Sequence, residues 1–292
     1  MWFQIRVPCQ RRRVADQMME LEPRLFQLRF GGAIGGYHSF GESGPQMSEK
    51  LAAKLNLVPS LVPNRTAIDP LIEYITKLSM IGVATGRVAN ELYLSMTEEI
   101  GEFYEGLGPK VVGSSTMPQK SNPKIIIELR ARSNQLRGKA AAVLIYPSPS
   151  HEGDAAVNRE LAITLEETCP LALFVVAKFN SVLSKIKPNR ERMKVNFLAS
   201  HEMMATEGLM MRLASDLGRS AAHDLIHDLV AKAAQSETPF CTLLRQEKTV
   251  TDNLSSVEID ALMSPENKTG QCVEIAKAAA AMGHSKARML LG

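Results

Sequence analysis

Residues 69–103 read DPLIEYITKLSMIGVATGRVANELYLSMTEEIGEF, and this stretch decides the fold. Its apolar side chains recur every three or four residues, which predicts one long helix with a single apolar stripe. Asp69 is expected at the N-cap and Pro70 at the first helical position. At 1.5 Å per residue the helix is on the order of 50 Å long, too long for one small globule to cover. The stretch therefore predicts an elongated helical bundle.

Small residues on this helix allow another helix to approach closely, and we expect some of that packing to occur between chains. Two further long helices are expected at 123–145 and 155–183, with shorter ones at 199–217, 220–235 and 272–282. Alternating strand patterns are nearly absent, so the fold class is all-α. The small residues are Gly82, Ala84 and Gly86.

The expected organisation has three parts: an atypical segment at 1–13, a long-helix bundle domain at 14–190 and a small helical domain at 191–292. Residues 1–13 include three consecutive arginines and have neither the apolar core of a signal peptide nor the pattern of a transit peptide. The helical periodicity begins only at Val14, as though a helix were already under way. We therefore expect a truncated or misjoined start.

Composition and charge limit the classes of molecule that the chain is expected to bind. A net charge of +3 is too small and too scattered to predict nucleic-acid binding, and no apolar run approaches the roughly 18 residues of a membrane span. The four cysteines lie far apart, which is typical of reduced thiols in a cytoplasmic protein and not of a metal or disulfide framework. The expected partner is a small molecule.

The polar segment between the long helices, GSSTMPQKSNP at 113–123, is the candidate for chemistry. Asn122 as N-cap and Pro123 at the first helical position would place the positive end of a helix after the loop, and with Lys120 this end favours a carboxylate. Ser114 and Ser115 supply hydroxyls, which become useful bases only where positive charge favours the alkoxide. On these features alone, a capped interhelical loop without chemistry is the simpler interpretation.

This segment resembles the signature G-S-S-x-M-P-x-K-x-N-P of the fumarase/aspartase superfamily, and every fixed position matches. The superfamily includes fumarases, aspartases, argininosuccinate and adenylosuccinate lyases, and 3-carboxy-cis,cis-muconate cycloisomerase. Residues 31–57 and 264–280 look most similar to the cycloisomerase and adenylosuccinate lyase branch. The resemblance implies a homotetramer of long-helix bundles in which three chains build each active site, and it implies that the N-terminal domain of the family lies outside this sequence.

The resemblance also implies roles for individual residues. Ser114 resembles the base that removes a proton from the carbon next to a carboxylate, and Lys120 and Asn122 resemble groups that bind the substrate carboxylate. Ser115 and His151 are expected to contact substrate as well, although His151 is equally well explained as a loop histidine. The implied substrate is a small succinyl-type or muconate-type carboxylate, converted by a lyase or cycloisomerase without a metal or organic cofactor.

A second interpretation is a catalytically inactive homologue that keeps the helical bundle for structure or interaction. It is motivated by Ile68 and Ile127, which stand where the family has an arginine and a glutamate. Two histidines one helical turn apart, His223 and His227, have the spacing of zinc ligands but lack an evident third ligand, so metal binding is not expected. Arg130 and Arg137 are expected to pair with glutamates across the bundle.

Overall fold

The computed structural model describes residues 2–106, 117, 122–145, 149–151, 153–236 and 238–291. Helices form nearly all of its regular structure, which confirms the predicted all-α class. The contacts divide the chain into two compact units. The first contains residues 2–97, 103–187 and 279–292, and the second contains residues 98–102 and 188–278.

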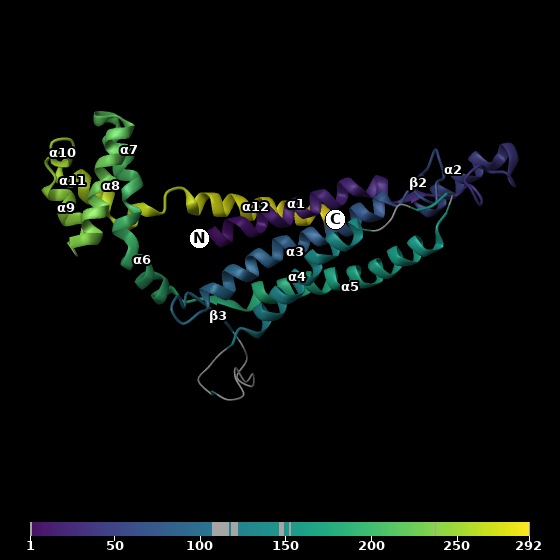
Figure 1. Ribbon diagram of the computed structural model, residues 1–292, viewed down its shortest axis with the longest axis horizontal. Coiled ribbons are helices and arrows are strands. Elements are labelled where there is room, and N and C mark those ends of the chain that lie inside the picture. Colours follow the sequence, from purple (N-terminus) through teal and green to yellow (C-terminus); the bar gives the residue numbers. More distant parts are fainter. Residues whose placement is uncertain are drawn as a thin grey trace. The chain divides into compact units, whose positions relative to one another are not determined.

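Three long helices form the body of the first unit: α3 (Asp69–Ser95), α4 (Lys124–Leu144) and α5 (Ala155–Lys185). They pack side by side (Figure 1), with α1 (Trp2–Leu25) against α3. The last part of α12 (Cys272–Leu291) meets α1, where the Lys286 ammonium lies 2.5 Å from the Asp16 carboxylate. Helix α1 begins at Trp2, upstream of Val14, where the apolar periodicity starts.

The core of the first unit follows the apolar stripes of these helices. Side chains at helical spacing become fully buried where α3, α4 and α5 meet, so the periodicity of the sequence sets the packing. A smaller cluster lies at the other end of α3 and α4 and includes Ile68, Ile75 and Val143. The main cluster contains Leu78, Val88, Ala89, Leu92, Ile126, Leu129, Leu136, Ala172, Val175, Phe179 and Val182.

Glycines bring α3 and α4 together. A Cβ on Gly82 would lie 2.6 Å from the Ser133 carbonyl oxygen, and one on Gly86 would lie 3.3 Å from the Ser133 Cβ. Between them the hydroxyls of Thr85 and Ser133 lie 2.8 Å apart in a buried hydrogen bond. The predicted close approach therefore occurs, but the glycine face packs within this chain.

Short strands and turns connect the helices. β1 (Gln27–Leu28) pairs in parallel with β2 (Val58–Pro59), and between them in the chain lie η1 (Gly41–Ser43) and α2 (Gly44–Leu55). The glycine-rich stretch 31–36 is a loop, as predicted. β3 (Phe103–Glu105) pairs with β4 (Ile186–Pro188), which directly follows α5.

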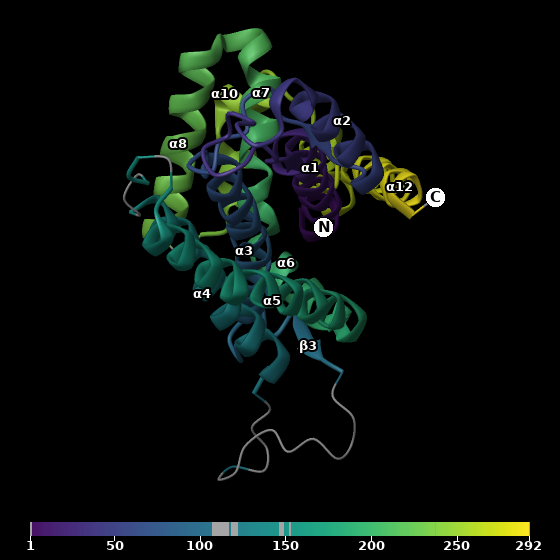
Figure 2. The same ribbon diagram turned by 90° about the vertical axis from the view of Figure 1, so that its right-hand side faces the viewer.

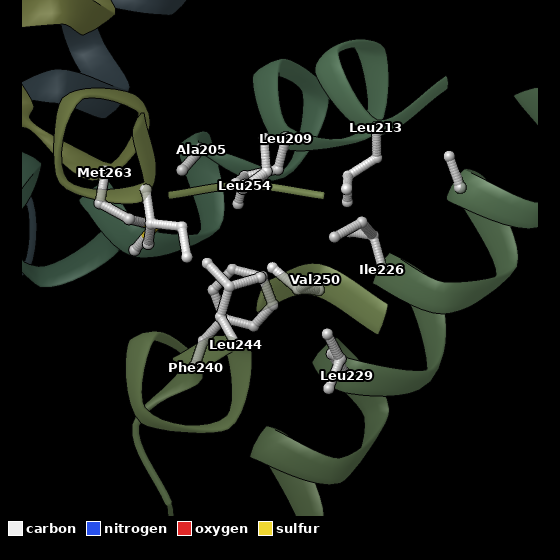
Figure 3. Packing of buried hydrophobic residues seen from close by; sticks show 12 residues of the cluster. Ala205, Leu209, Leu213, Ile226, Leu229, Phe240, Leu244, Val250, Leu254 and Met263 are labelled. Carbon is white, nitrogen blue, oxygen red and sulfur yellow. The ribbon is translucent and has the colours of Figure 1, made fainter. Parts of the chain in front are cut away.

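The second unit is a compact group of shorter helices. Apolar side chains from five of them surround Phe240, Leu244 and Val250, all at most 1% exposed (Figure 3). This core is separate from that of the first unit. The helices and the 3-10 turn of the second unit are α6 (Arg190–Met204), α7 (Thr206–Leu217), α8 (Arg219–Ser236), α9 (Phe240–Gln246), α10 (Lys248–Thr251), α11 (Ser256–Met263) and η2 (Pro265–Lys268).

Both ends of the long helix differ from the prediction. Ile68 is the N-cap of α3, so Asp69 is its first residue and makes no side-chain cap. The helix ends at Ser95, well before Phe103. Gly101 has a φ of +61°, and Arg192 of α6 donates to the carbonyls of Glu99 and Ile100 at 2.6 and 3.1 Å. These contacts stabilise a non-helical path for residues 98–102.

Candidate functional site

The predicted site residues divide between described and undescribed parts of the chain. Ser114, Ser115 and Lys120 lie outside the described residues, whereas Asn122 and His151 lie inside them. The structure therefore describes this part of the chain on either side of the undescribed residues. We call residues 103–106 the entry stem and residues 122–126 the exit stem.

The exit stem is the first turn of α4. Pro123 occupies the N-cap with φ −79° and ψ 78°, and no side chain of the cap residue bonds back to the helix. Asn122 is thus not the N-cap, and the prediction was wrong by one residue. The backbone carbonyl of Asn122 instead accepts from the Lys124 N–H at 2.9 Å.

A carboxylate from the entry stem takes over the capping of α4. The Oε1 atom of Glu105 accepts from the Ile126 N–H at 2.7 Å, and its Oε2 atom accepts from the Ile125 N–H at 3.2 Å. These two N–H groups lack partners within the helix, and a negative charge at this end also favours the helix dipole. The carboxylate at this helix end is therefore that of Glu105. The predicted binding of a substrate carboxylate here together with Lys120 stays a prediction, since Lys120 lies outside the described residues.

Glu105 was not among the predicted site residues, because it lies far along the chain from the helix that it caps. The familiar signal for a helix cap is a side chain one to three residues before the first helical N–H groups. Glu105 lies 21 residues before Ile126. The local hint is that the N-cap of α4 is Pro123, whose side chain makes no capping hydrogen bond.

The entry stem is held by the end of α5. Gly106 donates its N–H to the Lys185 carbonyl at 2.8 Å, next to the pairing of β3 with β4. A Cβ on Gly106 would lie 3.0 Å from that carbonyl oxygen and 3.1 Å from the Lys187 Cε, so the stem and α5 are in close contact. Figure 2 shows β3 at this end of the first unit.

His151 lies beyond the other end of α4, in the turn that leads into α5. It is exposed and has a φ of +48°. Three residues later Asp154 caps α5, accepting from the N–H groups of Ala156 and Val157 at 3.0 and 3.2 Å. Hydrogen bonds from the backbone of Val157 and Ser150 hold the pKa of the Asp154 carboxyl below its usual value. This cap fixes the turn in which His151 lies.

Asn122 and His151 are therefore separated by the whole of α4. This helix has 21 residues, which at 1.5 Å per residue makes it about 30 Å long. No small carboxylate spans that length. Within one copy of the chain the structure does not bring these two predicted substrate-binding residues together.

Ile68 and Ile127, which stand where the family has an arginine and a glutamate, have different environments. Ile68 is buried in the apolar cluster with Ile75 and Val143. Ile127 is 43% exposed, so no core requires an apolar side chain there. The neighbouring Glu128 pairs with Arg132 at 2.9 Å along α4. The Glu128 carboxylate, one residue after the position where the family has a glutamate, is thus engaged by Arg132.

Other charged candidates have ordinary local partners. The rings of His223 and His227 stack with centroids 6.2 Å apart, and within the described ranges no three His, Cys, Asp or Glu side chains gather as a metal site. Arg130 lies over the Tyr93 ring at 4.9 Å, and Arg137 donates to the Asn134 side chain at 3.3 Å. The predicted pairing of these two arginines with glutamates is not what the structure records.

None of the helices in the described part of the chain combines the length and the apolar character that a bilayer span requires.

The chain is similar to known lyases and cycloisomerases. The family described as Lyase matches residues 7–141, and the family described as Adenylosuccinate lyase C-terminus matches residues 202–279. The chain is 30% identical to 3-carboxy-cis,cis-muconate cycloisomerase of Pseudomonas aeruginosa over 88% of its own length and 56% of that protein. It is 26% identical to N-acetyl-S-(2-succino)cysteine lyase of Enterococcus italicus over 89% of its length and 57% of that protein.

A solved structure agrees with these matches. The crystal structure of 3-carboxy-cis,cis-muconate lactonizing enzyme from Pseudomonas putida superposes with a TM-score of 0.78 at 26% identity, covering 98% of this chain and 62% of the other. The chain thus spans a little more than half the length of the curated relatives that it matches.

Proposed function

We propose that this chain belongs to the fumarase/aspartase superfamily of lyases and that it carries the signature part of a lyase or cycloisomerase acting on a small carboxylate. The observation that carries the proposal is the complete signature at 113–123, which comes after an entry stem held by α5 and ends in the exit stem at the start of α4. A connection without chemistry needs neither the complete signature nor such firmly held ends.

The proposed reaction begins at carbon. Ser114 removes the proton on the carbon next to a substrate carboxylate, and the developing second negative charge spreads onto that carboxylate. Lys120 and Asn122 bind the carboxylate and stabilise this charge more strongly in the transition state than in the ground state, which is what lowers the barrier. Ser115 and His151 contact the substrate, and a general acid assists the departing group on the neighbouring carbon.

The substrate class follows from the relatives. One is named for a carboxylated muconate and another for a succinylated cysteine, and both names denote compounds with more than one carboxylate. We propose a succinyl-type or muconate-type substrate for this chain. The cytoplasm is the proposed setting, because Cys169, Cys241 and Cys272 are all free thiols, as expected of a reducing compartment.

The proposed assembly is a homotetramer with shared active sites. Asn122 and His151 lie at opposite ends of a helix about 30 Å long, so both can serve one substrate only if they come from different copies. A shared site of this kind makes activity dependent on assembly. Light scattering should then report a mass well above the 32.0 kDa of one chain.

The test is turnover of succinyl substrates and a carboxymuconate, followed by ultraviolet absorbance. We expect turnover from the chain, either alone or mixed with an inactive variant of a full-length relative. Ser114→Ala should abolish it while leaving the mass in solution unchanged. Absence of turnover in both settings would favour the inactive bundle, and an active Ser114→Ala variant would refute the role of that serine.

A further inference from the structure

We propose that Glu105 is a positioning residue for the signature segment: its carboxylate joins the entry stem to the exit stem and so sets where residues 107–121 begin and end. The inference deepens the proposed function and rests on it for its catalytic consequence. Its structural part, the link between the stems, stands on the hydrogen bonds of Glu105 alone.

Glu105 holds the start of α4 through two hydrogen bonds, one to each oxygen of its carboxylate. Each carboxylate oxygen of Glu105 accepts one N–H of the first turn of α4, at 2.7 Å from Ile126 and 3.2 Å from Ile125. Hydrogen bonds to an ionised acceptor are stronger than neutral ones. Glu105 is half-buried, which limits competition from water.

Backbone hydrogen bonds on either side of Glu105 hold it in place. Its own strand β3 pairs with β4, and the next residue, Gly106, donates to the Lys185 carbonyl at 2.8 Å. A Cβ on Gly106 would make a tight contact with the Lys185 oxygen, at 3.0 Å. The carboxylate thus connects the start of α4 to the end of α5 through one short, fixed stretch of backbone.

The cap by Glu105 is long-range, as is the contact of the Glu202 carboxylate with the Cys241 N–H in the first turn of α9 at 3.3 Å, whereas several other caps are local. Asp154 and Asn189 cap α5 and α6 by accepting from N–H groups two or three residues ahead, and Ser255 with Glu258 forms a local capping box on α11. Such caps hold only their own helix. Glu105 bonds across 20 and 21 residues, so it closes a loop as well as capping a helix.

The consequence for catalysis concerns orientation. Fixing both ends of a segment reduces the conformations it can adopt, and a displacement of a catalytic group by about 1 Å can cost on the order of 100-fold in rate. Loss of the Glu105 link should therefore lower kcat by roughly 10-fold to 100-fold. KM should change less, because the groups that bind the substrate are still present.

The experiment combines hydrogen exchange with kinetics on the full chain. Glu105→Ala removes both acceptors, and Glu105→Gln keeps one acceptor while placing an NH2 group against the other N–H. Asn189→Ala is the matched control, because it removes the side-chain cap of α6, which accepts from the Arg192 N–H at 3.2 Å, and leaves the Glu105 carboxylate in place. Amide exchange at Ile125 and Ile126 should accelerate by about 2-fold to 30-fold in Glu105→Ala, the range of N-cap losses, and by less in Glu105→Gln.

Each outcome decides something. Unchanged exchange at Ile125 and Ile126 in Glu105→Ala, or equal acceleration there in Asn189→Ala, overturns the link. Faster exchange with an unchanged kcat overturns the positioning role while the proposed function stands. Faster exchange in a chain whose wild type shows no turnover overturns the proposed function and supports the link.

Discussion

The seam between α3 and α4 allows a sharp test of the bundle. We consider Gly82→Ala, with Gly138→Ala as its control. Both glycines are helical, but a Cβ on Gly82 would lie 2.6 Å from the Ser133 carbonyl oxygen and 3.2 Å from the Arg137 nitrogen. A Cβ on Gly138 would meet nothing within 4 Å. The same substitution therefore meets a crowded site and an open one.

The magnitude follows from two opposing effects. Alanine in place of glycine favours a helix by about 1 kcal/mol at either position. At Gly82 the obstruction is backbone, which cannot rotate away, so α3 and α4 have to separate by several tenths of an ångström and stretch the buried hydrogen bond between Thr85 and Ser133. Overpacking of this kind costs about 1 to 3 kcal/mol. We expect Gly138→Ala to gain stability and Gly82→Ala to fall about 1 to 3 kcal/mol below it.

Thermal unfolding followed by circular dichroism measures this gap. At about 2 to 4 °C per kcal/mol for chains of 150 to 250 residues, the two variants should differ in Tm by several degrees. Both must be measured at one protein concentration, because assembly would make Tm depend on it. If Gly82→Ala unfolds at or above the Tm of Gly138→Ala, α3 and α4 do not approach each other as described.

Two further predictions concern the core and the turn before α5. Leu136→Ala should lower the free energy of unfolding by about 2 to 5 kcal/mol, because Leu136 is fully buried in the main cluster. Leu61→Ala should change it by less than about 0.5 kcal/mol, because Leu61 is 97% exposed. Equal losses of the two variants in urea titrations would contradict the core assignment. Backbone N–H groups of Val157 and Ser150 lower the pKa of the Asp154 carboxyl in the folded chain. The stability that this carboxylate contributes is therefore present above its unfolded pKa near 3.8 and is lost as the pH falls through its pKa in the folded chain. The Tm difference between wild type and Asp154→Ala should thus be present at pH 7 and shrink below about pH 4, and a difference independent of pH would show that the capping charge contributes nothing.

The sequence predicted what local chemistry decides. The starts of α3 and α4 were placed within one residue, because proline marks the first turn of a helix, and the start of α5 is exact. The overestimate of α3 has a different cause. Met96, Ile100 and Phe103 continue the helical stripe, but Arg192 and Asn196, nearly a hundred residues later, bond the Ile100 carbonyl and favour another path. No local pattern contains that information.

The same limit applies to the candidate site. The eleven-residue signature identified the segment and its candidate residues, and its consecutive residues carry that information by themselves. Its surroundings depend on partners far along the chain, which is why the cap by Glu105 and the anchoring of Gly106 on Lys185 were not anticipated. The predicted roles of Ser114, Ser115 and Lys120 stay predictions, since those residues lie outside the described part of the chain.

In the structure, the glycine face of α3 no longer supports assembly between chains. The glycine face of α3 was expected to contact other chains, yet Gly82 and Gly86 pack on Ser133 of the same chain. What the long helices leave exposed is a set of larger apolar side chains, among them Leu94 of α3 at 56% and Leu173 of α5 at 72%. Apolar surface of this extent on a helical bundle is typical of surfaces that another chain covers. The expectation of a tetramer thus rests on these side chains and on the separation of Asn122 from His151, and the glycine stripe no longer contributes to it.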